Sequence, residues 1–98
     1  MTPWFDWDEN KAAANEKKHD VSFVEAQAVF VDPFAATLYD PDHSGDEDRY
    51  ITVGLTTQMR LVVVSHTYRR GNGIRLISAR LATAHERQMY EQGRKRAR

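Results

Sequence analysis

The pattern of the chain changes at Phe34, and this change constrains the fold more than any other feature. Four short runs follow it, each rich in β-branched and aromatic residues and bounded by turn residues, as is typical of β-strands. They span residues 34–39, 50–55, 60–67 and 74–79. Because the last three runs are joined by short connections, neighbouring strands are expected to pair antiparallel. The sequence therefore predicts a four-stranded antiparallel sheet.

The first third of the chain has residue patterns typical of α-helices. Asp8 is a candidate N-cap for a helix that begins with acidic and ends with basic residues, which matches the helix dipole at both ends. Ser22 and Glu25 have the spacing of a capping box and open a second helix, which ends at Asp32 before Pro33. We predict two N-terminal helices joined by a very short turn.

A third helix is expected after the strands. Thr83 and Glu86 again have capping-box spacing, and Gly93 is well placed to end the helix. Two helices, four strands and a closing helix make an α+β domain. A chain of 98 residues has the length of one domain, so we assign residues 1–93 to a single domain and residues 94–98 to a basic C-terminal tail.

The charge of the chain is divided between its two halves. Residues 1–48 contain 12 acidic side chains and three lysines, whereas residues 49–98 contain 11 basic side chains, ten of them arginine, and two glutamates. Such asymmetry lets one face attract polyanions, and the planar fork of arginine suits phosphate. Charge alone favours nucleic-acid binding and mutual neutralisation of the two halves about equally.

Composition and motif spacing exclude several kinds of site. The chain has no cysteine, so disulfides, thiolate metal sites and a cysteine nucleophile are excluded, which suits a reducing cytosol. No secretory signal is visible and the longest apolar run, residues 61–64, is too short to cross a membrane, so we expect a cytoplasmic protein with no membrane partner. The loop 40–48 has the oxygen side chains of a calcium loop, but Ile51 occupies the place of its bidentate glutamate. We predict no metal and no cofactor.

Arginines on and beside the strands are the first candidates for a phosphate site. Arg75 and Arg80 lie on or just past the last strand, and regular strand alternation would place them on opposite faces. Both can reach one phosphate only if a β-bulge or the strand end intervenes. Together with Arg49, Arg69 and Arg70, they favour phosphate contact.

Two other residues have both a functional and a structural interpretation. His66 ends an apolar strand beside the arginines, where a histidine can act as general acid or base, although a half-buried structural histidine is the favoured alternative. Tyr90 shares a face of the last helix with Glu86 and could stack on a base. The commoner role of such a tyrosine is to fill a gap between helix and sheet.

Residues between about 5 and 91 also form an ordered signature. Its first part is Phe5-Asp6-Trp7-Asp8, Lys11, Asn15, Lys18-His19, Val21-Ser22-Phe23, Glu25-Ala26, Phe30 and Asp32-Pro33. Its second part is His43-Ser44, Glu47-Asp48-Arg49, Gly54, Arg75, Ile77-Ser78-Ala79-Arg80, Ala82-Thr83, Glu86 and Tyr90-Glu91. In order and spacing these residues resemble the BrnT toxin family. The chain departs from that family at Asp20, where glycine is usual, and at Val24 and Leu81.

The resemblance implies a RelE-like fold and a toxin of a type II toxin–antitoxin system, a ribonuclease that stops bacterial translation. It also implies a ribbon-helix-helix antitoxin, BrnA, which binds the toxin and, with it, operator DNA. The single RelE-like toxin domain would then be residues 1–93. The competing interpretation is a non-catalytic nucleic-acid-binding co-regulator that acts with a DNA-binding partner.

A metal-independent ribonuclease activates the RNA 2′-hydroxyl with a base, stabilises the phosphate charge with cations and protonates the leaving 5′-oxygen. Arg80 and Arg75 are expected to stabilise charge, and either His66 or Glu47 to transfer protons. The predicted catalytic residues are therefore Arg80, Arg75, His66 and Glu47. The residues predicted to contact RNA are Arg49, as a supporting cation, Arg69, Arg70 and Tyr90.

Overall fold

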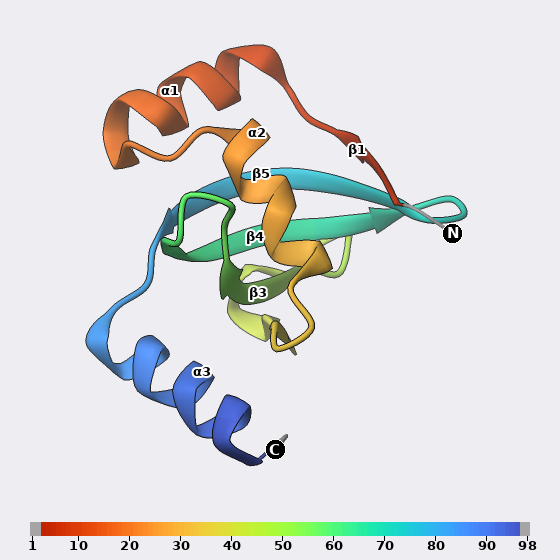
Figure 1. Cartoon of the computed structure of the whole chain (residues 1–98). Helices are drawn as coiled ribbons and strands as arrows, with labels where there is room; N and C mark the ends of the chain where they lie inside the picture. Colours follow the sequence, from red (N-terminus) through yellow and green to blue (C-terminus); the bar gives the residue numbers. More distant parts are fainter. Residues whose placement is uncertain (1–2, 97–98) are drawn as a thin grey trace.

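A five-stranded sheet forms the centre of the computed structural model, which describes residues 3–96 (Figure 1). Four strands pair antiparallel as predicted, in the spatial order β5-β4-β3-β2. Their bounds are β2 (Ala36–Tyr39), β3 (Tyr50–Leu55), β4 (Leu61–Arg69) and β5 (Gly73–Leu81). The α+β class is thus confirmed, with strand ends within two residues of those expected.

A fifth strand, β1 (Trp4–Asp6), corrects the predicted four-stranded antiparallel sheet. It pairs parallel with the start of β5, which makes the sheet mixed. Three residues are too few to show an alternating pattern in the sequence. The pairing depends on Gly73, because a Cβ atom there would lie 2.2 Å from the Trp4 ring.

The two N-terminal helices are also only partly as expected. Asp8 caps α1 (Glu9–His19), accepting hydrogen bonds from two backbone N–H groups of its first turn. The second helix is a single α-turn, α2 (Phe23–Ala26), that continues as the 3₁₀ helix η1 (Gln27–Val31). Two physical reasons account for this: η1 ends in β-branched and aromatic residues that are weak helix formers, and the residue before Pro33 avoids helical geometry.

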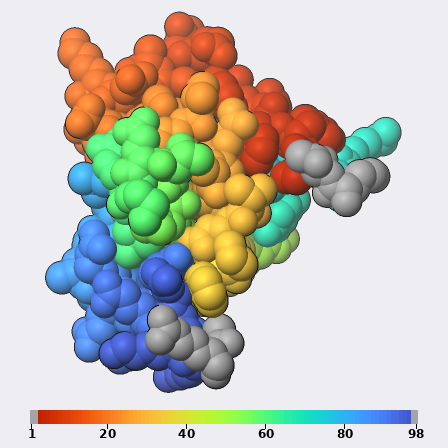
Figure 2. Space-filling model, viewed as in Figure 1, coloured from red at the N-terminus to blue at the C-terminus, as the bar shows by residue number. Residues whose placement is uncertain are grey.

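Only half of the predicted capping box forms at α2. Ser22 Oγ accepts a hydrogen bond from Glu25 N at 3.0 Å, as expected of an N-cap. The Glu25 carboxylate instead turns into the protein, where it accepts hydrogen bonds from Arg60 Nε at 2.9 Å and Thr56 Oγ1 at 2.8 Å. This network ties α2 to the β3–β4 turn, which Figure 2 shows in green between the orange N-terminal helices and the blue C-terminal helix.

Two apolar clusters cover the two faces of the sheet. On one face α1, α2 and η1 bury a core, and Figure 1 views the sheet from this side. Its members are Val21, Phe23, Ala26, Val29, Val62, Val64, Ile74, Leu76 and Ala79. On the other face, Tyr90 of α3 (Ala84–Arg96) packs on Val53, Leu61 and Val63. Strand β4 is therefore covered on both faces near its start, as its unbroken apolar run predicts.

The C-terminal helix extends past its predicted end. Its capping box is complete: Thr83 N donates to Glu86 Oε1 at 2.9 Å, and Glu86 N donates to Thr83 Oγ1 at 3.2 Å. Gly93 does not stop the helix, and residues 94–96 of the predicted tail are helical, whereas residues 97 and 98 lie outside the described part of the chain. The Arg94 guanidinium lies 5.2 Å from the centre of the Phe34 ring, a cation–π contact that favours the extra turn.

One buried amide anchors α1 to the outer edge of β5. Beyond Arg75 this edge has no strand neighbour in the described residues, because β1 ends at Asp6. The Asn15 side chain takes that place: its Nδ2 donates to Ala79 O at 2.9 Å and its Oδ1 accepts from Ala79 N at 3.0 Å. Nδ2 also donates to Val21 O at 3.0 Å. The amide thus satisfies three backbone groups in the interior.

Among residues 3–96, no helix combines the length and the apolar character needed to cross a membrane.

Candidate functional site

A β-bulge in β5 brings Arg75 and Arg80 to the same face of the sheet. Ser78 pairs with Ser65 and Leu76 pairs with His66, so Ile77 is an extra residue without a partner on β4. The bulge resets the alternation of side chains, which is why the buried core residues of β5 are spaced two and then three apart. Arg75 and Arg80 both lie opposite that core. Of the two alternatives that the sequence left open, a bulge or the strand end, the structure has the bulge.

We call this surface the arginine face and define it by Arg49, Arg69, Arg75 and Arg80. It is the sheet face away from α1 and α2, and in Figure 1 it points away from the viewer. Arg69 belongs to it because its Nη1 donates to Thr67 Oγ1 at 3.1 Å, on the same side of β4. Arg70 lies outside it, exposed in the turn between β4 and β5.

Two adjoining hollows open on the arginine face. The larger, about 230 Å³, is lined by Asp40, His43, Arg49, Ile51, Val63, Ser65, Ile77, Ser78 and Arg80. The smaller, about 80 Å³, is lined by Asp8, Lys11, Glu47, Arg49, Arg75, Leu76 and Ile77. Because Arg49 and Ile77 line both, the hollows meet at these residues. Three arginines predicted from the sequence therefore surround one recess at the bulge.

Carboxylates hold three of these arginines in place. Arg80 donates to Glu86 through both terminal nitrogens, at 2.8 and 2.9 Å. Arg75 Nη1 donates to Asp6 Oδ2 at 2.6 Å, and a third such pair holds Arg69. Each pair fixes a flexible side chain, and two of the three arginines, Arg75 and Arg80, line the recess, as charge stabilisation by a preorganised site requires.

The Arg80–Glu86 pair also keeps the Glu86 carboxylate ionised. The hydrogen bonds from Arg80 lower the pKa of Glu86 to about 2, with the Thr83 backbone N–H adding to the effect. The same pair raises the pKa of Arg80 above its usual value. Glu86 is thus ionised at any physiological pH, which suits it to hold Arg80 and not to exchange protons with a substrate.

Arg49 differs from the other arginines of the face because its guanidinium makes no ion pair with any residue between 3 and 96. Its backbone is nevertheless fixed: Arg49 N donates to Ser44 Oγ at 2.9 Å, and Ser44 Oγ donates to Asp40 O at 2.7 Å. The side chain is left as a cation available to a ligand at the junction of the two hollows.

Glu47 lines the smaller hollow beside Arg49 and Arg75. Its Oε2 accepts a hydrogen bond from Arg69 Nη1 at 2.9 Å, while its side chain stays 53% exposed. A half-exposed carboxylate beside cations is placed to accept a proton from a bound substrate.

The structure does not bring His66 to the arginine face. Its ring is fully buried on the opposite face, within ring-stacking distance of Phe30, Tyr50 and Tyr68. Its Nε2 is 2.8 Å from Thr52 Oγ1, and its Nδ1 has no hydrogen-bond partner within the described residues. Burial lowers the pKa of His66 to about 4. The ring is therefore neutral, as in the structural interpretation weighed from the sequence.

Tyr90 packs on the same face of the sheet as the arginines, but it is covered by α3 and lines neither hollow. It is 4% exposed, and its hydroxyl donates to Asp32 Oδ2 at 2.6 Å. Burial, together with Asp32, raises the pKa of Tyr90 to about 12. The ring fills the gap between α3 and the sheet, which is the commoner role considered for it, and it is not placed to stack on RNA.

Sequence reasoning missed His43, which lines the larger hollow with Arg49 and Arg80. Its Nδ1 lies 2.8 Å from Asp40 Oδ2. In the sequence, His43 was noted only as part of the family signature and of the loop 40–48. The signal that could have found it is an aspartate three residues before a histidine, in a loop that ends at an arginine.

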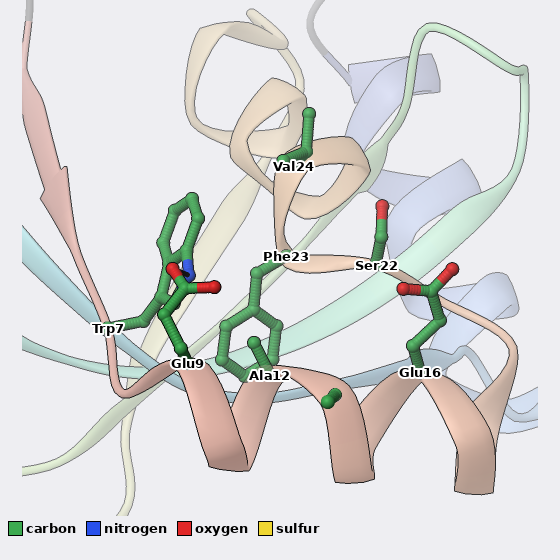
Figure 3. Close-up of a pocket in the computed structure, with 8 residues that line it drawn as sticks. Trp7, Glu9, Ala12, Glu16, Ser22, Phe23 and Val24 are labelled. Carbon is green, nitrogen blue, oxygen red and sulfur yellow. Dashed lines mark hydrogen bonds between the residues drawn. The ribbon is translucent and has the colours of Figure 1, made fainter.

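A separate groove lies between α1 and α2 (Figure 3). Trp7 and Phe23 are its aromatic lining, with ring centres 5.8 Å apart. The Glu9 side chain rises from α1 beside Trp7, and that of Glu16 lies further along α1 beside Ser22. Its lining contains no cation, so this acidic groove is not part of the phosphate-binding recess. Among residues 3–96, no group of three or more His, Asp or Glu side chains is arranged to hold a metal ion.

Comparison with known proteins agrees with the fold and with the resemblance drawn from the sequence. Residues 7–86 match the sequence profile of a family described as the ribonuclease toxin BrnT of type II toxin–antitoxin systems. The match covers most of the chain, and the chain belongs to the BrnT family. A protein of this family has RNA as its substrate and a protein antitoxin as its partner.

A solved structure shows the same fold. The 1.1 Å crystal structure of the Brucella abortus ribonuclease toxin BrnT matches with a TM-score of 0.61 at 20% sequence identity. The match covers 84% of this chain and 99% of the Brucella chain. No match was found among the curated proteins.

Proposed function

We propose that this toxin cleaves RNA at the arginine face by metal-independent general acid/base chemistry. The RNA 2′-hydroxyl attacks the adjacent phosphorus, and negative charge builds on the phosphate oxygens. Arg80 and Arg75 stabilise that charge from the two sides of the recess, and Arg49 supports them at its centre. The observation that supports the proposal is the bulge at Ile77, which puts Arg75 and Arg80 on one face, each lining one of two adjoining hollows.

Glu47 takes the proton of the 2′-hydroxyl in this proposal. Of the two proton-transfer candidates predicted from the sequence, only Glu47 lines the recess. His66 is fully buried on the other side of the sheet, where no substrate phosphate can reach it. Arg69 holds Glu47 and adds positive charge for the RNA backbone. Because the nucleophile is the 2′-hydroxyl, the enzyme acts on RNA and not on DNA.

The cellular role follows from the family. We propose that RNA cleavage in the cytoplasm inhibits translation, and that a BrnA-like ribbon-helix-helix antitoxin neutralises the toxin and recruits it to operator DNA. Family membership supports an antitoxin as partner. Its ribbon-helix-helix class rests on the resemblance.

Expression in a bacterial host tests this role. Wild type is expected to stop growth and incorporation of labelled methionine, whereas Arg80→Ala is expected to permit both. Arg87→Ala is the matched control, since Arg87 is an exposed arginine on α3 that lines neither hollow. Co-expression of a ribbon-helix-helix protein encoded beside the toxin should restore growth. Arrest by Arg80→Ala as strong as by wild type would contradict the proposal.

A further inference from the structure

His43 has the surroundings of a group that transfers protons. It shares the larger hollow with Arg49 and Arg80, the cations proposed to hold the phosphate. Its Nδ1 is bonded to Asp40 Oδ2 at 2.8 Å, and Nε2 has no partner within residues 3–96. A carboxylate that accepts from Nδ1–H fixes the ring tautomer and leaves Nε2 for a substrate. The side chain is 68% exposed, so RNA can reach it.

The loop that carries His43 is fixed at both ends. Asp40 N donates to Arg49 O at 2.8 Å, which closes the loop at the ends of β2 and β3. Ser44 Oγ joins Asp40 O to Arg49 N, and residues Pro41–His43 form the 3₁₀ turn η2. Asp40 itself is only 17% exposed. The histidine is therefore held beside Arg49 by the same hydrogen bonds that fix the Arg49 backbone.

We propose that His43 is the general acid of the cleavage reaction and that Asp40 is its positioning residue. This assignment rests on the proposed function and completes it. The 2′-oxygen forms a bond to phosphorus as Glu47 takes its proton. The bond between phosphorus and the 5′-oxygen breaks as His43 Nε2 gives its proton to that oxygen. The products are a 2′,3′-cyclic phosphate and a free 5′-hydroxyl, so no external water or redox partner is consumed.

The arginines that line the larger hollow, and the carboxylate that holds Arg80, are less suited to this step. Glu86, with its pKa lowered to about 2, holds no proton to donate at neutral pH. The arginines do not release protons in proteins. Histidine is the side chain whose ordinary titration lies near physiological pH, so it can give a proton and recover it in each turnover. Asp40, Arg49 and Arg80 are the charged groups that share the hollow with His43.

A substrate with a better leaving group tests the acid directly. Wild type, His43→Gln and Asp40→Asn are compared on a short RNA with one cleavable linkage and on the same RNA with sulfur in place of the bridging 5′-oxygen. A thiolate leaves without protonation because its pKa is far below that of an alcohol. His43→Gln should cleave the oxygen substrate about 100-fold or more slowly than wild type. It should cleave the sulfur substrate at close to the wild-type rate. Asp40→Asn should show a smaller loss that is relieved in the same way.

The matched control is His19→Gln, on the last turn of α1 and away from both hollows, which should behave as wild type on both substrates. His43→Gln with full activity on the oxygen substrate would overturn the assignment of His43 alone. Equal loss on both substrates would also overturn the acid role, because a protein that lacks only its acid keeps activity on sulfur. Cleavage of neither substrate by wild type would overturn the proposed function as well.

Discussion

Replacing Asn15 with alanine removes the amide that completes the outer edge of β5. Three backbone groups lose their partner: Val21 O, Ala79 N and Ala79 O. Ala79 is fully buried and Asn15 is 7% exposed, so water cannot replace the lost hydrogen bonds without opening the structure. Each buried polar group left unsatisfied costs about 1–3 kcal/mol.

The three groups together give an expected loss of at least about 3 kcal/mol in the free energy of unfolding, reduced by ~0.5 kcal/mol because alanine is the better helix former. A domain of this size is stable by roughly 5–15 kcal/mol. The loss should lower the melting temperature by about 10 °C or more. Urea and thermal unfolding followed by circular dichroism measure both quantities.

The matched control is Asn10→Ala, an exposed asparagine on the first turn of the same helix, which should change stability by less than about 0.5 kcal/mol. If Asn15→Ala lowered the free energy of unfolding by no more than this control, the Asn15 amide would not be holding β5. The reasoning that places α1 as a support for the bulged strand would then be refuted.

Three further substitutions test other parts of the structure by urea unfolding. Glu86→Gln should be less stable than wild type by about 1–2 kcal/mol above pH 4.5, a figure reduced for the partial exposure of Arg80. The difference should disappear as the pH falls towards 2, because the folded-state pKa of Glu86 is lowered to about 2 from 4.5. A difference independent of pH would contradict the Arg80–Glu86 pair. Asp20→Gly should raise stability by about 0.5–1 kcal/mol, since Asp20 has φ 58° and its side chain is 98% exposed, and a loss would show that the aspartate is not strained. Gly54→Ala should cost roughly 1–3 kcal/mol, because a Cβ there would lie 2.9 Å from Val29 Cβ; unchanged stability would mean that η1 does not press on β3.

The strands that the sequence predicts well are those with a long, patterned signal. Residues 50–55 match β3 at both ends, because β-branched residues and the turn at 56–58 define it locally. Strand β1 had no such signal, since it depends on contact with Gly73, a residue almost seventy positions away. Gly93 did not end α3 because the contact of Arg94 with Phe34, also distant in sequence, favours the longer helix.

The candidate site was predictable in its charges but not in its geometry. The sequence indicated Arg75 and Arg80, and strand alternation implied that a bulge or the strand end was needed to bring them together. The bulge itself depends on pairing between β4 and β5, which no local pattern at Ile77 reveals. The side of the sheet that buries His66 depends in the same way on η1, which places Phe30 over it. The sequence did not predict His43 as a site residue, because closure of the loop 40–49 brings it beside the arginines and no local spacing pattern reveals this closure.

Cleavage of a labelled RNA by the purified toxin, free of antitoxin and in excess EDTA, tests the central claim most directly. The account predicts that wild type and Arg87→Ala cleave the RNA, and that Arg80→Ala loses about 100-fold or more, with Arg80→Lys between them because it keeps the charge and loses the fork. Circular dichroism of each variant confirms that it is folded. Cleavage by Arg80→Ala at the wild-type rate, or wild-type activity that EDTA abolishes and added metal restores, would contradict a metal-independent site at the arginine face.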